Sequence, residues 1–311
     1  MKPKIAIVGA GLIGRAWAIV FARAGHPVAM TDVDAAALAR ARALMGERLA
    51  DLQEFGLIDE SPAQVLARIT CTASLGDTLM GAALAQENVR ETLAAKQEIF
   101  AQLDALAPAD CVIASSTSWI PASQYTATLA GRARCLVAHP TNPPYLIPLV
   151  ELCPAPWTAP ASVARARELY ADAGQQPVTL TREIHGFLLN RVQGAVLNEC
   201  FNLYSQGLAS AEDIDRVLKD GLALRWCFMG PFETIDLNAP GGVADYAARY
   251  GHTYRDVAAV HAPFAWDAAT VARIEAERRA VLPQDRLEAR SAWRDRRLMA
   301  LLAHQRLAPA S

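Results

Sequence analysis

A short apolar strand runs directly into a glycine-rich turn at the start of the chain. Residues Lys4–Gly14 read KIAIVGAGLIG, so the strand is followed at once by Gly9-x-Gly11-x-x-Gly14. Gly9 permits a tight turn, Gly11 lets backbone approach a pyrophosphate, and Gly14 lets the next helix pack closely on the strand. A strand, three glycines and a helix in this order predict the first half of a dinucleotide-binding sheet.

The residues around this turn indicate which dinucleotide fits. Backbone N–H groups of Leu12 and Ile13, in the first turn of the helix, would face the pyrophosphate. Asp32 ends the second apolar run, where a carboxylate accepts hydrogen bonds from a ribose and repels a 2′-phosphate. Val33 and Asp34 follow, so no arginine is present there to hold that phosphate, and NAD is favoured over NADP. The alternative is that Asp32 only caps the helix that begins near Asp34.

Composition sets wider limits on what the chain can be. At 311 residues, with 52% hydrophobic content, it is long enough for two domains. Its formal charge of −2 comes from 30 basic and 32 acidic residues without long blocks of one sign, which argues against nucleic acid or a membrane surface as a partner. No apolar stretch reaches the ~20 residues that span a bilayer. The first strand begins at once, leaving no room for a signal peptide, so we expect a cytoplasmic protein.

The cysteines predict neither a metal site nor a catalytic thiol. Six are present, and none forms a CxxC motif or lies at zinc-finger spacing from a histidine pair. Cys111, Cys135 and Cys153 lie in or beside apolar runs, where cysteine usually serves as a small buried hydrophobe. A reducing compartment is the natural inference.

Apolar, strand-like runs alternate with helical stretches over the first part of the chain. The strand-like runs are Ile5–Val8, Val28–Thr31, Ile69–Ala73, Ala82–Gln86, Cys111–Ser115, Cys135–Ala138, Leu149–Cys153 and Pro177–Thr181. The helical stretches are 12–25, 34–54, 91–106 and 160–174, and 42–68 is long enough for a helical excursion from the sheet. This alternation predicts an α/β fold with a mainly parallel, doubly wound Rossmann-type sheet over residues 1–183. From residue 184 onward apolar residues recur at helical spacing, so 184–311 is expected to form an all-helical domain.

Polar residues occur at or near the ends of three neighbouring strands, where an open parallel sheet binds its ligands. Ser115–Ser118 follows one strand, His139–Pro144 follows the next, and Glu151 lies inside an apolar run. A buried glutamate is costly unless it is paired, and histidine is a favourable partner. Imidazole titrates near neutral pH, so it suits removal of a hydroxyl proton as hydride departs, with a carboxylate to orient it. The alternatives are a structural His–Glu pair and serines that cap a helix.

Longer motifs add a resemblance that covers nearly the whole chain. They are GLIGRAWA at 11–18, KQEIFAQLD at 96–104, VAHPTNPPYLIPLVELCP at 137–154, GFLLNR at 186–191, DGLALRW at 220–226, GPFETIDLNA at 230–239 and WRD at 293–295. With these motifs the chain resembles the 3-hydroxyacyl-CoA dehydrogenase superfamily, and within it the lambda-crystallin branch, whose members oxidise L-gulonate. The stretch HPxNPPYxIPLVEL is a far more specific signal than the glycine turn.

The resemblance implies roles for individual residues. His139 would be the general base and Glu151 its orienting partner. Ser118 and Asn190 would hydrogen-bond the reacting oxygen and place the substrate against the nicotinamide. The further residues implied near the cofactor or in the same pocket are Glu91, Lys96 and Asn142. The loop 87–92 departs from the family pattern, because Arg90 and Thr92 stand where Pro and Asn are usual. Arg90 either turns toward the cofactor or a substrate carboxylate or faces solvent.

The charge of the helical excursion bears on the substrate. Coenzyme A carries several phosphates, and the hydroxyacyl-CoA enzymes resemble one another in a lysine-bearing excursion. Here residues 47–68 contain five acids, two arginines and no lysine, a net charge of −3 that disfavours a polyphosphate. A small polar acid fits better, and its carboxylate needs a cation. Arg225 is the candidate, since guanidinium binds carboxylate bidentately; a surface salt bridge is the alternative.

Together these observations predict an NAD-dependent dehydrogenase that oxidises the 3-hydroxyl of L-gulonate or a similar short hydroxy acid. One alternative keeps the chemistry but takes 3-hydroxybutyrate, carnitine or a 3-hydroxyacyl-CoA. An alternative of another class is a non-catalytic NADH-binding protein with a structural, crystallin-like use. The helical domain resembles the dimerisation region of the family, so we expect a homodimer.

Overall fold

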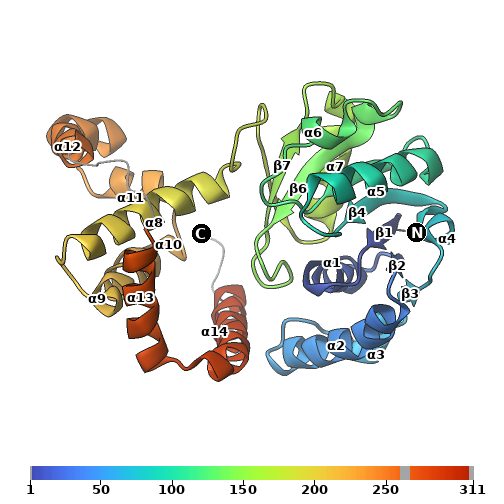
Figure 1. Ribbon diagram of the computed structural model, residues 1–311, viewed down its shortest axis with the longest axis horizontal. Coiled ribbons are helices and arrows are strands. Elements are labelled where there is room, and N and C mark those ends of the chain that lie inside the picture. The colour runs from blue at the N-terminus through green and yellow to red at the C-terminus, as the bar shows by residue number, and fades with distance from the viewer. Residues whose placement is uncertain (1, 260–266, 308–311) are drawn as a thin grey trace. The chain divides into compact units, whose positions relative to one another are not determined.

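The computed structural model describes residues 2–259 and 267–307 (Figure 1). The chain forms two compact units. The sheet unit comprises Met1–Asn190 and Ser291–Ser311, and the helical unit comprises Arg191–Arg290. The division expected from the sequence, 1–183 and 184–311, differs from the observed one because the last helix belongs mostly to the sheet unit.

The sheet unit contains a sheet of eight strands in the order β3-β2-β1-β4-β5-β6-β7-β8. The strands are β1 (Lys4–Val8), β2 (Val28–Thr31), β3 (Ile69–Cys71), β4 (Ala82–Glu87), β5 (Val112–Ser115), β6 (Cys135–Pro140), β7 (Leu149–Pro154) and β8 (Gln176–Thr179). Neighbouring strands are parallel except for the antiparallel pair β6 and β7. The prediction of a mainly parallel, doubly wound sheet is confirmed. The strand order reverses between β1 and β4, the point at which such sheets bind ligands.

Helices cover both faces of this sheet. They are α1 (Leu12–Arg23), α2 (Ala35–Glu54), α3 (Pro62–Leu66), α4 (Leu75–Leu79), α5 (Leu93–Leu106), α6 (Ser123–Thr126), the 3₁₀ turn η1 (Arg132–Arg134) and α7 (Pro160–Asp172). On one face α1 and α7 pack through the rings of Trp17, Phe21 and Tyr170, whose centroids lie 5.3 to 5.7 Å apart. On the other face α5 packs through Phe100 and Leu103. Burial on both faces explains why the strands read as continuous apolar runs.

The three strand-associated cysteines belong to this second core. Cys111, Cys135 and Cys153 are fully buried, as the sequence predicted. Burial raises the pKa of each thiol to about 12, because the thiolate would lose its hydration. These thiols are therefore packing groups rather than nucleophiles at neutral pH.

The helical unit contains no strand among its described residues. Its elements are α8 (Leu189–Ser205), which begins in the sheet unit, α9 (Ala211–Arg216), the π-helical turn η2 (Val217–Leu222), α10 (Ala223–Trp226), α11 (Pro231–Leu237), α12 (Gly242–Ala259), α13 (Ala268–Val281) and η3 (Gln284–Arg286). Tyr204 of α8 donates to Glu277 of α13 at 2.5 Å, which ties the first and last long helices of the unit together. In the described part of the chain, no helix is both long and apolar enough to cross a membrane.

The last helix, α14 (Leu287–Leu307), returns to the sheet unit. Met299 is fully buried in the core that α1 and α2 share. Arg296 lies over the ring of Phe55 and pairs with Glu54 at 2.5 Å and Asp51 at 3.3 Å. This segment falls within the predicted all-helical domain of residues 184–311, but helical periodicity does not say which core a helix joins. The burial of Met299 and the ion pairs of Arg296 place α14 against the core of the sheet unit.

Candidate active site

The glycine turn has the shape that a pyrophosphate needs. Gly9 has φ +101, and a Cβ there would lie 2.8 Å from the carbonyl oxygen of Asn88. A Cβ on Gly14 would collide with the carbonyl oxygen of Gly9, so the helix packs closely on the turn only because Gly14 has no side chain. A Cβ on Gly11 would meet nothing within 4 Å. The backbone of the turn therefore requires glycine at positions 9 and 14. Gly11 leaves open space beside the start of α1, where an anion fits.

Asp32 lies at the rim of the same turn. Its carboxylate accepts hydrogen bonds from the backbone N–H of Ala10 at 2.6 Å and of Asp34 at 2.9 Å. Each oxygen retains a lone pair for a ribose hydroxyl. The N-cap of α2 is Asp34, whose side chain accepts from Ala36 N at 2.8 Å, so the capping role considered for Asp32 belongs to its neighbour. The open space at Gly11 and the half-buried Asp32 together fit a dinucleotide with a free 2′-hydroxyl.

His139 and Glu151 are partners. They lie directly opposite each other on the antiparallel strands β6 and β7, so their side chains project from the same face. His139 Nδ1 lies 2.8 Å from Glu151 Oε2, and the two residues are 5% and 1% exposed. An ionised carboxylate only accepts, so Nδ1 is the donor in this contact, and in the neutral imidazole Nε2 is then the acceptor. This is the arrangement of a positioned base.

The second oxygen of Glu151 fixes the carboxylate. Oε1 accepts from the backbone N–H of Leu188 at 2.8 Å and of Leu189 at 2.9 Å, at the start of α8. A buried carboxylate with three donors is satisfied, and the helix N-terminus favours its charge. Phe187, fully buried at φ +50, packs against the imidazole of His139 with ring centroids 5.5 Å apart. The turn before α8 therefore holds both members of the pair.

The structure also brings Ser118 and Asn190 together. Asn190 Nδ2 donates to the carbonyl oxygen of Ser118 at 2.7 Å, which leaves the Ser118 hydroxyl and the Asn190 oxygen for a ligand. Asn190 directly follows Leu189, one of the two donors to Glu151. A continuous set of contacts thus connects His139 to the loop after β5.

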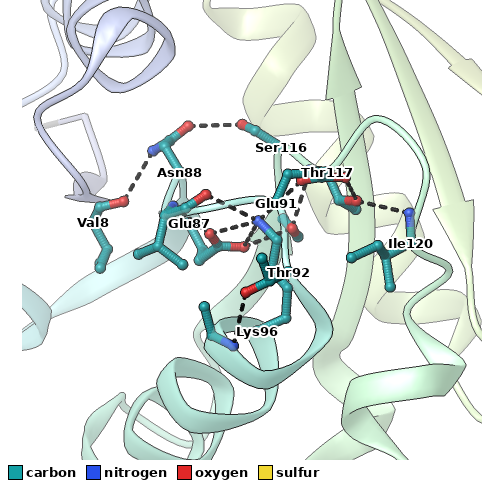
Figure 2. A network of polar contacts seen from close by, with 12 residues as sticks. Val8, Glu87, Asn88, Glu91, Thr92, Lys96, Ser116, Thr117 and Ile120 are labelled. Atoms are coloured by element: carbon teal, nitrogen blue, oxygen red, sulfur yellow. Dashed lines mark hydrogen bonds and ion pairs between the residues drawn. The ribbon is translucent and has the colours of Figure 1, made fainter.

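A buried ion pair supports that loop from below (Figure 2). Lys96 of α5 is 1% exposed, and its ammonium donates to both oxygens of Glu87, at 2.8 and 2.9 Å. Burial raises the pKa of Glu87, while Lys96 and the hydroxyl of Ser115 at 2.6 Å oppose that rise. Lys96 is therefore occupied within the protein. A direct contact between Lys96 and a ribose, implied by the resemblance, stays a prediction.

Glu91 joins this ion pair to the serine loop. Its Oε1 accepts from the hydroxyl of Thr117 and from the backbone N–H of Ser118 at 3.0 Å and Trp119 at 3.2 Å (Figure 2). Its Oε2 lies 3.5 Å from Lys96. Glu91 thereby fixes the loop that carries Ser118, and its contact with the cofactor stays a prediction.

Sequence reasoning missed several residues of this edge. Glu87 is central to the polar network of Figure 2 but was not singled out, and Thr117 was named only as part of the polar run Ser115–Ser118. The available signal for Glu87 was a carboxylate directly after the apolar run Ala82–Gln86. Trp119 and His185 were also missed. Their rings lie 5.8 Å apart at an angle of 40°, and Trp119 is 50% exposed beside Ser118.

Among the described residues, the side chains of Asn142 and Arg90 form no hydrogen bond or ion pair with this network, and Arg225 belongs to the helical unit. Asn142 is exposed, next to a cis bond to Pro143. Arg90 is exposed, which matches the solvent-facing alternative. Arg225 is exposed on α10 of the helical unit. Within the residues that the structure describes, no group of three or more His, Cys, Asp or Glu side chains is arranged to hold a metal ion.

The net negative charge of the helical excursion, residues 47–68, is partly offset by a cation from outside the segment. Arg68 pairs with Glu60 at 2.5 Å inside the segment, as counted from the sequence. Arg296 of α14 adds a cation against Glu54 and Asp51 that the segment's own charge does not include. No lysine is added, so the absence of lysines for a polyphosphate stands while the net charge becomes milder.

Comparisons with known proteins agree with this geometry. The sequence matches the NAD-binding domain of 3-hydroxyacyl-CoA dehydrogenase over residues 4–184 and the C-terminal domain of the same family over residues 186–277. It is 41% identical over 308 residues to a lambda-crystallin homolog of Bos taurus, covering 97% of this chain and 96% of that relative. It is 38% identical over 249 residues to an L-carnitine dehydrogenase of Streptomyces griseus, covering 80% and 73%.

A solved structure extends the similarity to the whole fold. The 5-dehydrogenase of 5-formyl-3-hydroxy-2-methylpyridine 4-carboxylic acid, described as an NAD⁺-dependent dismutase, superposes with a TM-score of 0.84 at 28% identity, covering 99% of this chain and all of that one. The glycine turn, the paired imidazole and carboxylate, and the two family matches all point the same way. The chain belongs to the 3-hydroxyacyl-CoA dehydrogenase family and is an NAD-dependent oxidoreductase that acts on a CH–OH group.

Proposed function

We propose that this enzyme oxidises the 3-hydroxyl of a short hydroxy acid, with L-gulonate to 3-dehydro-L-gulonate as the leading reaction. The observation that carries the chemistry is the pair of His139 and Glu151, 2.8 Å apart and almost completely buried. A His–Glu pair that only stabilised the fold could lie anywhere in the sheet. This one lies on β6 and β7, whose loops bound the same edge as the glycine turn.

In the proposed mechanism, NAD held at the glycine turn would supply the acceptor for the hydride that leaves the substrate carbon. His139 removes the hydroxyl proton at Nε2, so that the C–H and O–H bonds break and a carbonyl forms. Glu151 keeps Nδ1–H in place and stabilises the imidazolium that results. The side chains of Ser118 and Asn190 hydrogen-bond the reacting oxygen, and the contact between Asn190 and the Ser118 carbonyl holds these groups together.

The choice of substrate rests on charge and on relatives. The lysine-free excursion supports a small acid over an acyl-CoA, because residues 47–68 carry more acids than cations and both arginines, Arg48 and Arg68, pair with acids of the same segment. The high identity to lambda-crystallin homologs supports L-gulonate, given the activity of that branch. Arg225 is proposed to hold the substrate carboxylate.

L-Carnitine is the second candidate, and a specific observation favours it. The Streptomyces carnitine dehydrogenases are 38% identical over 80% of this chain. Carnitine is also a short 3-hydroxy acid, so it would use the same base. The exposed Trp119 ring offers a face for a quaternary ammonium. 3-Hydroxybutyrate and 3-hydroxyacyl-CoA remain further alternatives, and a structural, crystallin-like role would need no turnover at all.

We also propose that the protein acts as a homodimer in the cytoplasm. Support comes from the helical unit, where large apolar side chains are exposed on three successive helices, α10, α11 and α12. Exposed apolar surface of this extent is typical of a subunit interface rather than of a monomer.

A panel of hydroxy acids, followed by NADH absorbance, tests the proposed function. We expect the highest kcat/KM with L-gulonate, and in His139→Ala a fall in kcat of about 10²- to 10⁴-fold. NADH binding, measured by fluorescence, should be unchanged in that variant. A variant that keeps its activity would exclude His139 as the base. Wild-type protein that binds NADH but oxidises no hydroxy acid would favour the structural role instead.

A further inference from the structure

A second polar pocket lies in the sheet unit, where α1 ends and α14 packs. Its volume is about 250 Å³. Arg23, Tyr145, Gln305 and Arg306 are the lining residues with polar side-chain groups. The other lining residues are Leu57, Leu146, Pro148, Gly174 and Leu302. The pocket therefore combines two guanidinium groups with a wall that contains no acidic side chain.

Arg23 has no opposing charge in this pocket. It is the last residue of α1, and its Nη1 donates to the carbonyl oxygen of Tyr145 at 2.9 Å. Burial lowers the pKa of Arg23 to about 10, and the positive charge of Arg306 lowers it as well. Arg306 in turn donates to the carbonyl oxygen of Gly56 at 3.2 Å. Among the described residues, both guanidiniums thus contact carbonyl oxygens rather than carboxylates.

The acid two residues before the lining residue Gly174 already has partners. Asp172 precedes the lining residue Gly174, but its carboxylate pairs with Lys2 at 3.0 Å and with His26 Nε2 at 3.0 Å. Placing two cations at one pocket without an acidic side chain in its lining is costly, because the buried Arg23 loses hydration and the charge of Arg306 repels it. A small anion removes both costs, and the planar fork of guanidinium matches the oxygens of a phosphate or sulfate.

We propose that this pocket binds a small oxyanion of the phosphate class between Arg23 and Arg306. The site is separate from the dinucleotide site, because α1 has 12 residues and the glycine turn lies at its other end. At 1.5 Å per residue that separation is about 18 Å. An anion bound there links α1 to α14, so it stabilises the packing of the returning helix on the sheet unit.

Titration of inorganic phosphate by calorimetry tests the proposal. NADH is kept at saturation so that phosphate does not occupy the pyrophosphate position, and ionic strength is held constant with chloride. We expect saturable binding at one site, at least about tenfold weaker in Arg23→Met and in Arg306→Met. The matched control is Arg297→Met, an exposed arginine of the same helix, which should bind phosphate like the wild type.

The thermal midpoint gives a second measurement. Phosphate should raise the Tm of the wild type and of Arg297→Met, but not that of Arg306→Met, because a ligand stabilises only the fold that binds it. If Arg23→Met does not fold, the exposed Arg306 still provides the comparison. Absence of saturable binding in the wild type, or equal binding in wild type and Arg306→Met, would overturn the proposal.

Discussion

The two units of this enzyme differ in how completely they bury their apolar side chains. The sheet unit has cores on both faces of the sheet, and even its charged groups Glu87 and Lys96 are buried as a pair. The helical unit leaves many large side chains exposed, among them Leu224, Trp226, Phe228, Phe232, Leu237, Val243, Tyr250 and Tyr254. The difference teaches that the sheet unit forms its main apolar cores from its own elements, whereas the helical unit leaves an apolar surface that the proposed homodimer would cover.

The cause lies in the geometry of the elements. A parallel sheet has two apolar faces, and crossover helices cover both as the chain is wound. A helix hairpin such as α11 and α12 has several sides and covers only those that meet within its own unit. In this family the uncovered sides of the helical domain are expected to meet a second subunit, which is the basis of the proposed dimer.

The largest effect is expected from breaking the buried ion pair of the sheet unit. Lys96→Met leaves Glu87 without its counter-charge, and loss of one partner of a buried pair costs about 3–5 kcal/mol of unfolding free energy. Urea denaturation measures this loss. The double variant Glu87→Gln with Lys96→Met should recover much of it, since neither charge is then buried alone. Equal stability of the single variant and the wild type would contradict the account.

The same variant predicts a pH dependence of stability. Burial already raises the pKa of Glu87, and without Lys96 it rises further. A carboxyl group whose pKa is higher in the folded state than in the unfolded state binds its proton more tightly when folded. It stabilises the fold at pH values below its unfolded pKa, and this contribution is lost as the pH rises through its folded pKa. The unfolding free energy of Lys96→Met should therefore fall from pH 5 upward, at up to about 1.4 kcal/mol per pH unit. A flatter profile in the variant than in the wild type would contradict this.

A charge on the helical unit tests the other side of the comparison. Phe232 of α11 is 77% exposed, so Phe232→Glu should not unfold the subunit. If α11 lies in the dimer interface, the substitution should weaken dimerisation by about 100-fold, through loss of apolar contact and burial of a charge. Light scattering across a dilution series measures this. Met80→Glu, at an exposed apolar residue of the sheet unit, is the control and should leave the dimer intact.

Arg225 tests whether the helical unit takes part in catalysis. Arg225→Ala should raise the KM for L-gulonate by about tenfold or more and change kcat less, because a carboxylate contact contributes mainly to binding. Lys substitution should restore part of the affinity. Steady-state kinetics with L-gulonate and with an uncharged hydroxy analogue separate this role from a structural one. Unchanged kinetics would remove Arg225 from the site.

Much of the sheet was predictable because its signal is local. Runs such as Ile5–Val8 and Val28–Thr31 are observed with the same bounds as predicted, except that β1 begins one residue earlier at Lys4. Ala82–Gln86 was expected to be a strand despite its alanines, and β4 is observed there in the middle of the sheet. Burial between two neighbours outweighs the low strand propensity of alanine.

The pairing of His139 with Glu151 was also predictable, because a carboxylate in an apolar strand requires a partner. The other contacts were not. The pairing of Glu87 with Lys96, the N–H groups of α8 that hold Glu151, and the return of α14 all depend on segments far apart in the sequence. Periodicity identifies an element but not its neighbour, and a charge count over residues 47–68 does not include an arginine from α14.

Trp119 is an exposed aromatic in a unit that buries most of its aromatic rings. Its backbone is fixed by Glu91 at 3.2 Å and Thr117 at 3.4 Å, so the ring is held at the surface beside Ser118. We expect it to form a wall of the substrate site together with His185. Trp119→Ala should raise KM about tenfold and leave kcat within a few-fold, the loss expected for one aromatic contact.

The variant Trp119→Phe tests whether the contact between residue 119 and the substrate requires an aromatic ring. Trp119→Phe should retain most of the affinity for a hydroxy acid, because stacking on the carbon chain needs only a ring face. If the preferred substrate carries a quaternary ammonium, the order of affinity should be Trp, then Phe, then Ala, since the indole binds a cation most strongly. A fall in kcat at constant KM would place Trp119 with the groups that position Ser118 rather than with those that bind substrate.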